Sequence, residues 1–170
     1  YSCVKCDRNM NSGRILVDTV DQVPILKFIG DVRVLMSSAL DNYFSSLYEK
    51  PVLDKMIVDM TETYGIDSTA LGLIAKMAIQ LRNRFNVSPT IVSTNPDITR
   101  ILRSMSIDRI CNIVENMDSK EAEFDELNQL DETEETVRQK VIEAHQTLMA
   151  LSDENKVEFQ DLISVLKADN

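Results

Sequence analysis

The sequence predicts an α/β fold, with helices packed on a mixed, mostly parallel sheet and an α-helical extension at the C-terminus. Short apolar runs alternate with longer segments whose apolar residues recur every three or four positions, in the order β-β-α-β-α-β-α-β over about the first 115 residues. Helices between strands imply crossover connections and parallel pairing. After Val114 the composition turns strongly acidic, which marks the start of the extension.

Five apolar segments have the length and composition of strands. They are residues 14–19, 23–29, 56–59, 89–93 and 109–114. The first two are separated by a short turn, so they are the antiparallel exception in the sheet. Pro24 lacks a backbone donor and should lie at a strand start or edge. After Asp59 we expect a polar loop that contains Gly65.

Three helices are predicted between these strands. The first covers residues 35–48, the second begins near Ser68 and ends near Phe85, and the third begins at Pro96 after Asn95. In the second helix, Leu73 and Met77 fall beside the main apolar stripe. The pattern allows two interpretations of these side chains: they form an exposed contact patch, or they belong to the ordinary core.

The chain divides into a flexible arm at residues 1–13, an α/β domain at 14–117 and an acidic helical extension at 118–170. In the extension we expect a helix at 119–130, a heptad-like stripe at 137–151 and a final helix after Ser152-Asp153, the last two forming a helical hairpin. The stripe is more typical of an intramolecular packing face than of a dimer seam, although a homodimer through these helices remains open.

The acidic stretch at residues 118–136 also has more than one interpretation. Such stretches are usually a solvated face. The alternatives are an acidic surface that attracts a basic partner by its charge, and a segment that covers a functional surface.

The net charge of -10 argues against nucleic-acid binding and against attraction to an anionic membrane. No run approaches the roughly 18 apolar residues of a membrane span, and no signal peptide is visible, so a cytoplasmic location is expected. Cys3 and Cys6 form a CxxC pair, but the other zinc-ligand candidates, Cys111 and His145, are distant in sequence. We expect free thiols, no metal and no cofactor.

Asp67-Ser68-Thr69 lie where a buried strand gives way to a helix, a common place for a functional group. Two hydroxyls and a carboxylate suit a phosphorylation switch better than catalysis. From spacing alone, a helix N-cap is the more common role for such a serine. The single histidine, His145, is expected to be a solvated helix residue, so no nucleophile has a base and an enzyme is not expected.

The stretch Asp59-Met60-Thr61 … Ile66-Asp67-Ser68-Thr69-Ala70-Leu71-Gly72-Leu73 resembles the STAS domain of bacterial anti-sigma factor antagonists. That family's signature is an apolar strand, a short loop, and Asp-Ser-Ser/Thr-Gly-Leu-Gly opening a helix. Phe28-Ile29-Gly30-Asp31-Val32 resembles a second family segment, between the second strand and first helix. Element order also agrees over residues 14–117. Ala70 replaces a usual Gly, and Arg33 replaces a common Asp.

The resemblance implies partner switching and no catalysis. An unphosphorylated antagonist captures an anti-sigma factor that is also a serine kinase of the histidine-kinase-like ATPase fold. Phosphorylation disrupts the capture, and a PP2C-type phosphatase restores it. On this chain the implied acceptor is Ser68, with Thr69 less suited. The other implied switch-loop and partner-binding residues are Asp67, Asp31 and Asp59 at strand and helix ends, together with Leu73 and Met77.

A phosphate on Ser68 would add about two negative charges beside free N–H groups at a helix start, so the domain should stay folded. On a partner surface fitted to a neutral hydroxyl, a loss of about 3 kcal/mol would weaken binding more than a hundredfold. The competing classes are a STAS-type scaffold subunit of a larger signalling assembly and, ranked lower, a small-molecule binder, since no Gly-rich phosphate loop is present.

Overall fold

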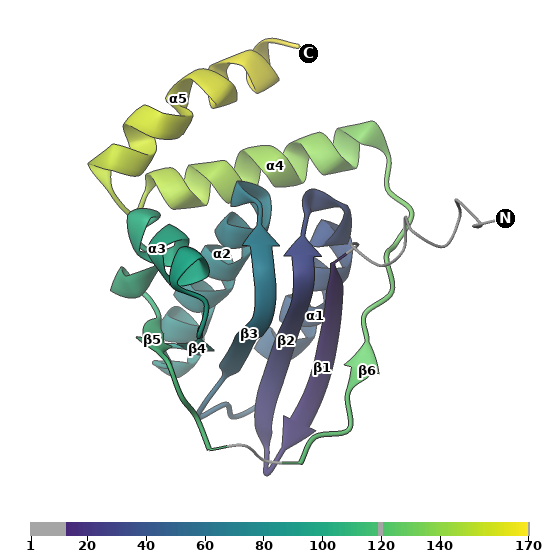
Figure 1. The fold of residues 1–170 in the computed structure, drawn as a ribbon. Coiled ribbons are helices and arrows are strands. Elements are labelled where there is room, and N and C mark those ends of the chain that lie inside the picture. Colours follow the sequence, from purple (N-terminus) through teal and green to yellow (C-terminus); the bar gives the residue numbers. More distant parts are fainter. Residues whose placement is uncertain (1–12, 119–120, 170) are drawn as a thin grey trace, which may run out of the picture.

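The computed structural model describes residues 13–118 and 121–169. Its centre is a six-stranded sheet in the order β5-β4-β3-β2-β1-β6 (Figure 1). β1 pairs antiparallel with β2 and β6, whereas β2, β3, β4 and β5 pair parallel to one another. The strands are β1 (Arg14–Val20), β2 (Val23–Val32), β3 (Ile57–Ile66), β4 (Thr90–Val92), β5 (Asn112–Val114) and β6 (Asp125–Glu126). The predicted mixed, mostly parallel sheet is confirmed.

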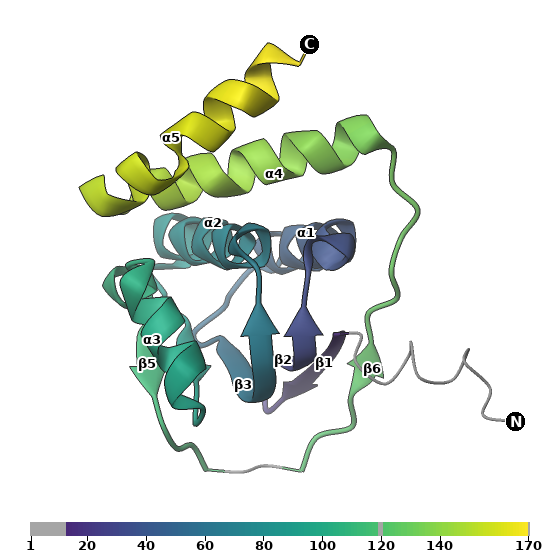
Figure 2. The same cartoon turned by 45° about the horizontal axis from the view of Figure 1, so that its top comes forward.

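The helices form layers on this sheet. In Figure 2, α1 and α2 lie side by side on one face, α4 lies across them on the side away from the sheet, and α5 packs on α4. α3 lies at the end of the sheet that holds β4 and β5 (Figure 1). The α-helices are α1 (Ser37–Tyr48), α2 (Ser68–Phe85), α3 (Pro96–Ser104), α4 (Glu134–Met149) and α5 (Asp153–Ala168). Two short 3₁₀ helices, η1 (Val34–Met36) and η2 (Ile107–Arg109), precede α1 and β5.

The core lies between the sheet and the α1–α2 layer, and α2 contributes most to it. Most apolar side chains of α2 are fully buried, because they share one cluster with side chains of β2 and β3. Leu73 and Met77 belong to this set, each with 0% of its surface exposed. An exposed contact patch at these two positions is therefore wrong, and they are ordinary core residues in this fold.

β3 is longer than the sequence predicts. It continues past Asp59 to Ile66, so the expected polar loop around Gly65 is wrong. β2 also extends to Val32. Its backbone pairs with the polar second half of β3, and the pairing contains two register shifts. Pairing with a neighbouring strand thus overrides the weak strand propensity of this segment.

The predictions for the last strand and the first acidic helix need correction. Residues 107–109 form η2 and only Asn112–Val114 form β5, because the N–H groups of Ile110 and Cys111 both bond back to Ile107 O. A helix at residues 119–130 is wrong: the described part of this segment holds β6 on the outer edge of β1. Pairing there satisfies an otherwise open strand edge, and it buries part of Leu127 against the core.

The two C-terminal helices are present, as predicted. Their buried residues include Ala144 and Leu148 from the expected stripe, and also Ile142 and His145. The break between them is a helix start, where the Ser152 side chain accepts a hydrogen bond from Asn155 N.

The N-terminal thiols Cys3 and Cys6 lie outside the described residues. Cys111 is buried, which raises the pKa of its thiol to about 12. Within residues 13–118 and 121–169, no group of three or more His, Cys, Asp or Glu side chains could hold a metal ion. In the same described ranges, no helix has the length and apolarity needed to cross a membrane.

Candidate functional site

β2 and β3 are parallel, so both end at the same edge of the sheet, and Asp67 connects the segments that come after the two strands. Its backbone N–H donates to Val32 O at 3.0 Å. One carboxylate oxygen accepts from Ala70 N at 2.8 Å and the other from Val34 N at 2.6 Å. Asp67 is therefore the N-cap of α2 and also fastens the start of η1 beside it.

Ser68 is the first residue of α2 and takes no part in this cap. Its hydroxyl Oγ lies 2.7 Å from Nε2 of His145 on α4. The other ring nitrogen, Nδ1, lies 2.6 Å from the carbonyl oxygen of Val141. A carbonyl only accepts, so Nδ1 carries the proton, and in the neutral ring Nε2 accepts a hydrogen bond from the Ser68 hydroxyl.

His145 is buried, with 2% of its surface exposed, so its interpretation as a solvated residue is wrong. Its ring also packs edge-on against Phe159 of α5, with centroids 4.9 Å apart. The sequence does carry a signal for this burial. His145 comes four residues after Val141 and three before Leu148, which puts it on the apolar face of α4.

α2 and α4 approach closely one turn beyond Ser68. A Cβ atom added to Gly72 would lie 2.3 Å from the carbonyl oxygen of Ala144 and 2.6 Å from its Cβ. Real side chains do not tolerate such contacts, so this approach of the two helices requires glycine at position 72.

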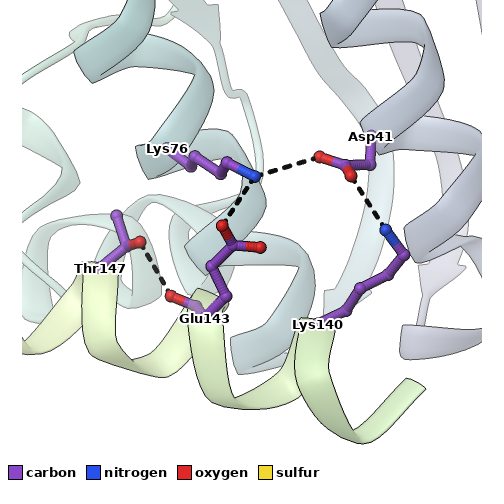
Figure 3. Close-up of polar contacts among 5 residues, drawn as sticks. All are labelled: Asp41, Lys76, Lys140, Glu143 and Thr147. Atoms are coloured by element: carbon purple, nitrogen blue, oxygen red, sulfur yellow. Dashed lines mark hydrogen bonds and ion pairs between the residues drawn. The ribbon is translucent and has the colours of Figure 1, made fainter. Parts of the chain in front are cut away.

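A chain of ion pairs joins α1, α2 and α4 beside this contact (Figure 3). Asp41 of α1 lies 2.9 Å from Nζ of Lys140 on α4 and 3.4 Å from Nζ of Lys76 on α2. Lys76 also pairs with Glu143 of α4 at 3.0 Å. We call these four residues the clasp.

The charges of the clasp shift two pKa values. Partial burial would raise the pKa of Asp41, but the hydrogen bond from Lys140 and the positive charges of Lys76 and Lys140 outweigh it and lower that pKa. Burial would likewise lower the pKa of Lys76, but Glu143 and Asp41 raise it overall. Both shifts favour the charged forms that hold the clasp together.

Asp31 lies at the same edge of the sheet as Asp67, near the end of β2. Its Oδ2 accepts from Nε of Arg33 at 2.9 Å, and its Oδ1 is buried with no hydrogen-bond partner among the described residues. The side chain lies over Gly65, where an added Cβ would be 2.4 Å from Oδ1. Arg33 therefore neutralises the carboxylate at this edge.

Asp59 does not lie at a strand end, contrary to the expectation. It lies near the start of β3, where its Oδ1 accepts from the backbone and hydroxyl of Thr61. At about 3.3 Å per residue, the remainder of β3 separates it from Ser68 by more than about 20 Å. Thr69, next to Ser68, is buried. The structure thus brings Ser68, Asp67 and Asp31 to one edge and leaves Asp59, Leu73 and Met77 elsewhere.

The comparisons with known proteins agree with this architecture. The family model of the STAS domain matches residues 14–120. The chain belongs to the STAS domain family. A solved anti-sigma factor antagonist from Mycobacterium paratuberculosis shares the STAS fold with a TM-score of 0.55 and 17% identity, over 64% of this chain and 90% of that one. A second structure, a candidate anti-sigma factor antagonist from Thermotoga maritima, has a TM-score of 0.47 and 22% identity, covering 59% of this chain and 86% of the other. No curated protein matches the chain.

The STAS match ends at residue 120, before α4 and α5 begin. His145, Lys140 and Glu143 are therefore additions to the STAS domain. The side chain that contacts the motif serine of the STAS domain comes from outside the matched residues.

Proposed function

We propose that this STAS protein is an anti-sigma factor antagonist that switches partners by phosphorylation of Ser68, and so regulates transcription. One observation carries the proposal: Asp67, not Ser68, caps α2. The interpretation of Ser68 as a mere N-cap is thereby removed. Among the described residues of the STAS match its hydroxyl has no hydrogen-bond partner, and its one contact is with His145 of α4, which supports a role as a chemical switch.

The chemistry of the position suits a switch that changes binding and leaves the fold intact. A phosphate at the first residue of α2 lies beside the positive end of the helix dipole, which favours negative charge. The same charge of about -2 would have to be desolvated by a partner that fits a neutral hydroxyl. The proposed partners are an anti-sigma factor with serine kinase activity, of the histidine-kinase-like ATPase fold, and a PP2C-type phosphatase.

Ser68 is a better acceptor than Thr69, because Thr69 is buried and Ser68 is only partly buried. Asp31, paired with Arg33, and Asp67 border the same edge and complete the proposed partner-facing loop. The proposal includes no catalytic role. His145 Nδ1 donates to a backbone carbonyl of its own helix, whereas a catalytic base is usually oriented by a third side chain.

A pull-down from lysate of the native host tests the proposal, with wild type, Ser68→Ala and Ser68→Glu as baits. Wild type and Ser68→Ala should retain a kinase-like anti-sigma factor. Ser68→Glu should fail to retain it, because its affinity for that partner should be more than a hundredfold lower. Ser45→Glu, which adds the same charge at an exposed serine of α1, is the matched control and should behave as wild type. Equal capture by Ser68→Glu would refute a switch at this residue.

A scaffold role is the second candidate, and the outer surface of α5 favours it. Val157, Leu162 and Val165 are exposed there, with Val157 69% exposed. Apolar side chains on a terminal helix suit association with another chain, including a second copy. Light scattering at increasing concentration separates the candidates, since a large, defined oligomer supports the scaffold and a monomer supports the partner switch.

A further inference from the structure

The helix pair α4–α5 lies over the serine that the proposed switch modifies. α4 lies across α1 and α2 (Figure 2), and Nε2 of its His145 is 2.7 Å from the hydroxyl oxygen of Ser68, the first residue of α2. We propose that α4–α5 is an intramolecular lid whose docked position and the phosphorylated state of Ser68 exclude each other, and which competes with the partner for one face of α2. The competition with a partner rests on the proposed function. The mutual exclusion of docked α4 and phosphorylated Ser68 does not depend on it.

The exclusion follows from space and charge at the hydroxyl. A phosphoryl group on Oγ would occupy the position that the imidazole of His145 fills. That ring has no room to retreat, because Phe159 packs against it and Val141 O holds its far nitrogen. Burying about two added charges at this contact would also require a compensating partner. The phosphorylated chain must therefore move α4 away from α2.

The competition follows from which face of α2 the lid covers. Ser68, Gly72 and Lys76 recur every four residues, so they form one stripe along α2. α4 contacts all three, through His145, Ala144 and Glu143 in order. A partner that distinguishes the free hydroxyl from the phosphate must touch this stripe, and it cannot do so while α4 is docked.

The contacts of the lid allow it to open without leaving the molecule. Next to Ser68 they are one hydrogen bond, a glycine contact and the clasp (Figure 3), while Ala144 and Leu148 add apolar contacts to the core. At the turn between α4 and α5, Asn155 is buried and donates to Met105 O and Leu148 O, each at 2.8 Å. At the other end, the Ser38 hydroxyl bonds to Glu132. These anchors keep the effective concentration of α4 high, so it can dock again quickly.

Three states result. With Ser68 unphosphorylated and the lid docked, the Ser68 hydroxyl is bonded to His145 and the partner face of α2 is closed. With Ser68 free and the lid open, the partner or the kinase can bind. With Ser68 phosphorylated the lid stays open, but the partner is repelled. The two equilibria are linked. If phosphorylation of Ser68 raises the equilibrium constant for lid opening by a given factor, opening the lid raises the equilibrium constant for phosphorylation by the same factor.

Hydrogen exchange on the full chain, without any partner, tests the lid. Gly72→Ala adds a Cβ against Ala144 while raising the intrinsic helix propensity of α2, so it should weaken the lid and leave the STAS domain folded. Ser68→Glu places charge and volume against His145. In both variants, amides of residues 141–149 should exchange at least tenfold faster than in wild type, with no change in residues 26–32 and 57–63.

Asn83→Ala is the matched control, because it raises helix propensity at an exposed position of the same helix. Its α4 amides should exchange as in wild type. Wild-type protection of α4 in both Gly72→Ala and Ser68→Glu overturns the lid. A tenfold loss of amide protection that also includes β2 and β3 overturns it too, because α4 and α5 would then unfold together with the domain as one cooperative unit.

The pull-down with Gly72→Ala as an extra bait separates the lid from the proposed function. Capture of the kinase-like partner at least tenfold above wild type supports competition by the lid. Equal capture together with faster α4 exchange overturns the competition while the proposed function stands. If no bait captures such a partner but α4 exchanges faster, the proposed function fails and the exclusion between docked α4 and modified Ser68 stands.

Discussion

The two faces of α2 differ in kind. The face toward the sheet is continuous and apolar, and its side chains, such as Leu73, Ile74 and Met77, are fully buried. The face toward α4 presents a hydroxyl, a glycine and an ammonium group at Ser68, Gly72 and Lys76. Apolar burial of this extent holds the domain together, whereas single polar contacts contribute about 1 kcal/mol each. One helix thus combines the interface that holds the domain together with the interface that we propose to be reversible.

The largest effect is expected on the sheet side. Leu73→Ala should lower the free energy of unfolding by about 2 to 5 kcal/mol, because it leaves a cavity beneath α2. Urea denaturation monitored by circular dichroism measures this, with the exposed Val157→Ala as control. A cost below about 1 kcal/mol would show that Leu73 is not part of the packed core.

A smaller effect is expected on the α4 side. Ser68→Ala leaves His145 Nε2 buried without its partner, which should cost about 1 to 3 kcal/mol. The cost should appear as faster amide exchange in α4, with the global unfolding of the sheet little changed. In a double-mutant cycle with His145→Ala, a coupling energy near zero would mean that the two side chains do not interact in solution.

The clasp gives the α4 side a dependence on pH. Since Lys140 and Lys76 lower the pKa of Asp41 in the folded chain, its contribution is complete above the unfolded value of about 3.9 and is lost as pH falls through the folded pKa. Besides the two lysines, Glu143 of the clasp and the neighbouring Tyr48 are ionisable groups near Asp41. Asp41→Asn should cost about 0.5 to 1 kcal/mol at pH 7, since the clasp is partly solvated.

Urea unfolding of wild type and Asp41→Asn at several pH values between about 3 and 7 checks this. The difference between the two proteins should shrink as the pH falls below about 4. A difference that stays constant over the whole range would remove Asp41 as the source of the pH dependence.

The smallest effect is expected away from both faces. Arg100 pairs with Asp97 on α3 with 75% of its side chain exposed. Arg100→Ala should therefore change the free energy of unfolding by no more than about 0.5 kcal/mol. The same denaturation assay measures it, and a larger loss would point to a role for α3 that neither face of α2 explains.

Much of the fold was predictable, because the residues that form it carry local signals. The period-three and period-four spacing of Leu71, Ile74 and Ala78 predicts α2, and Asn95 before Pro96 predicts the start of α3. The predictions of secondary structure were wrong where pairing with a strand distant in sequence determined the conformation. The edge of β1 recruits Asp125 and Glu126 into β6, and β2 extends β3 to Ile66. Neither pairing partner is visible from the local sequence.

The sequence by itself determined the order of the main helices and strands as far as β5, the family motif and the placement of Ser68 at a helix start, because periodicity and helix-capping chemistry act over a few residues. Only the tertiary structure decided that Asp67 caps α2 in place of Ser68, and that His145, 77 residues further along the chain, closes over the hydroxyl. A contact across that separation depends on how α4 packs on α2. That packing depends on the absence of a side chain at Gly72, which local sequence patterns do not reveal.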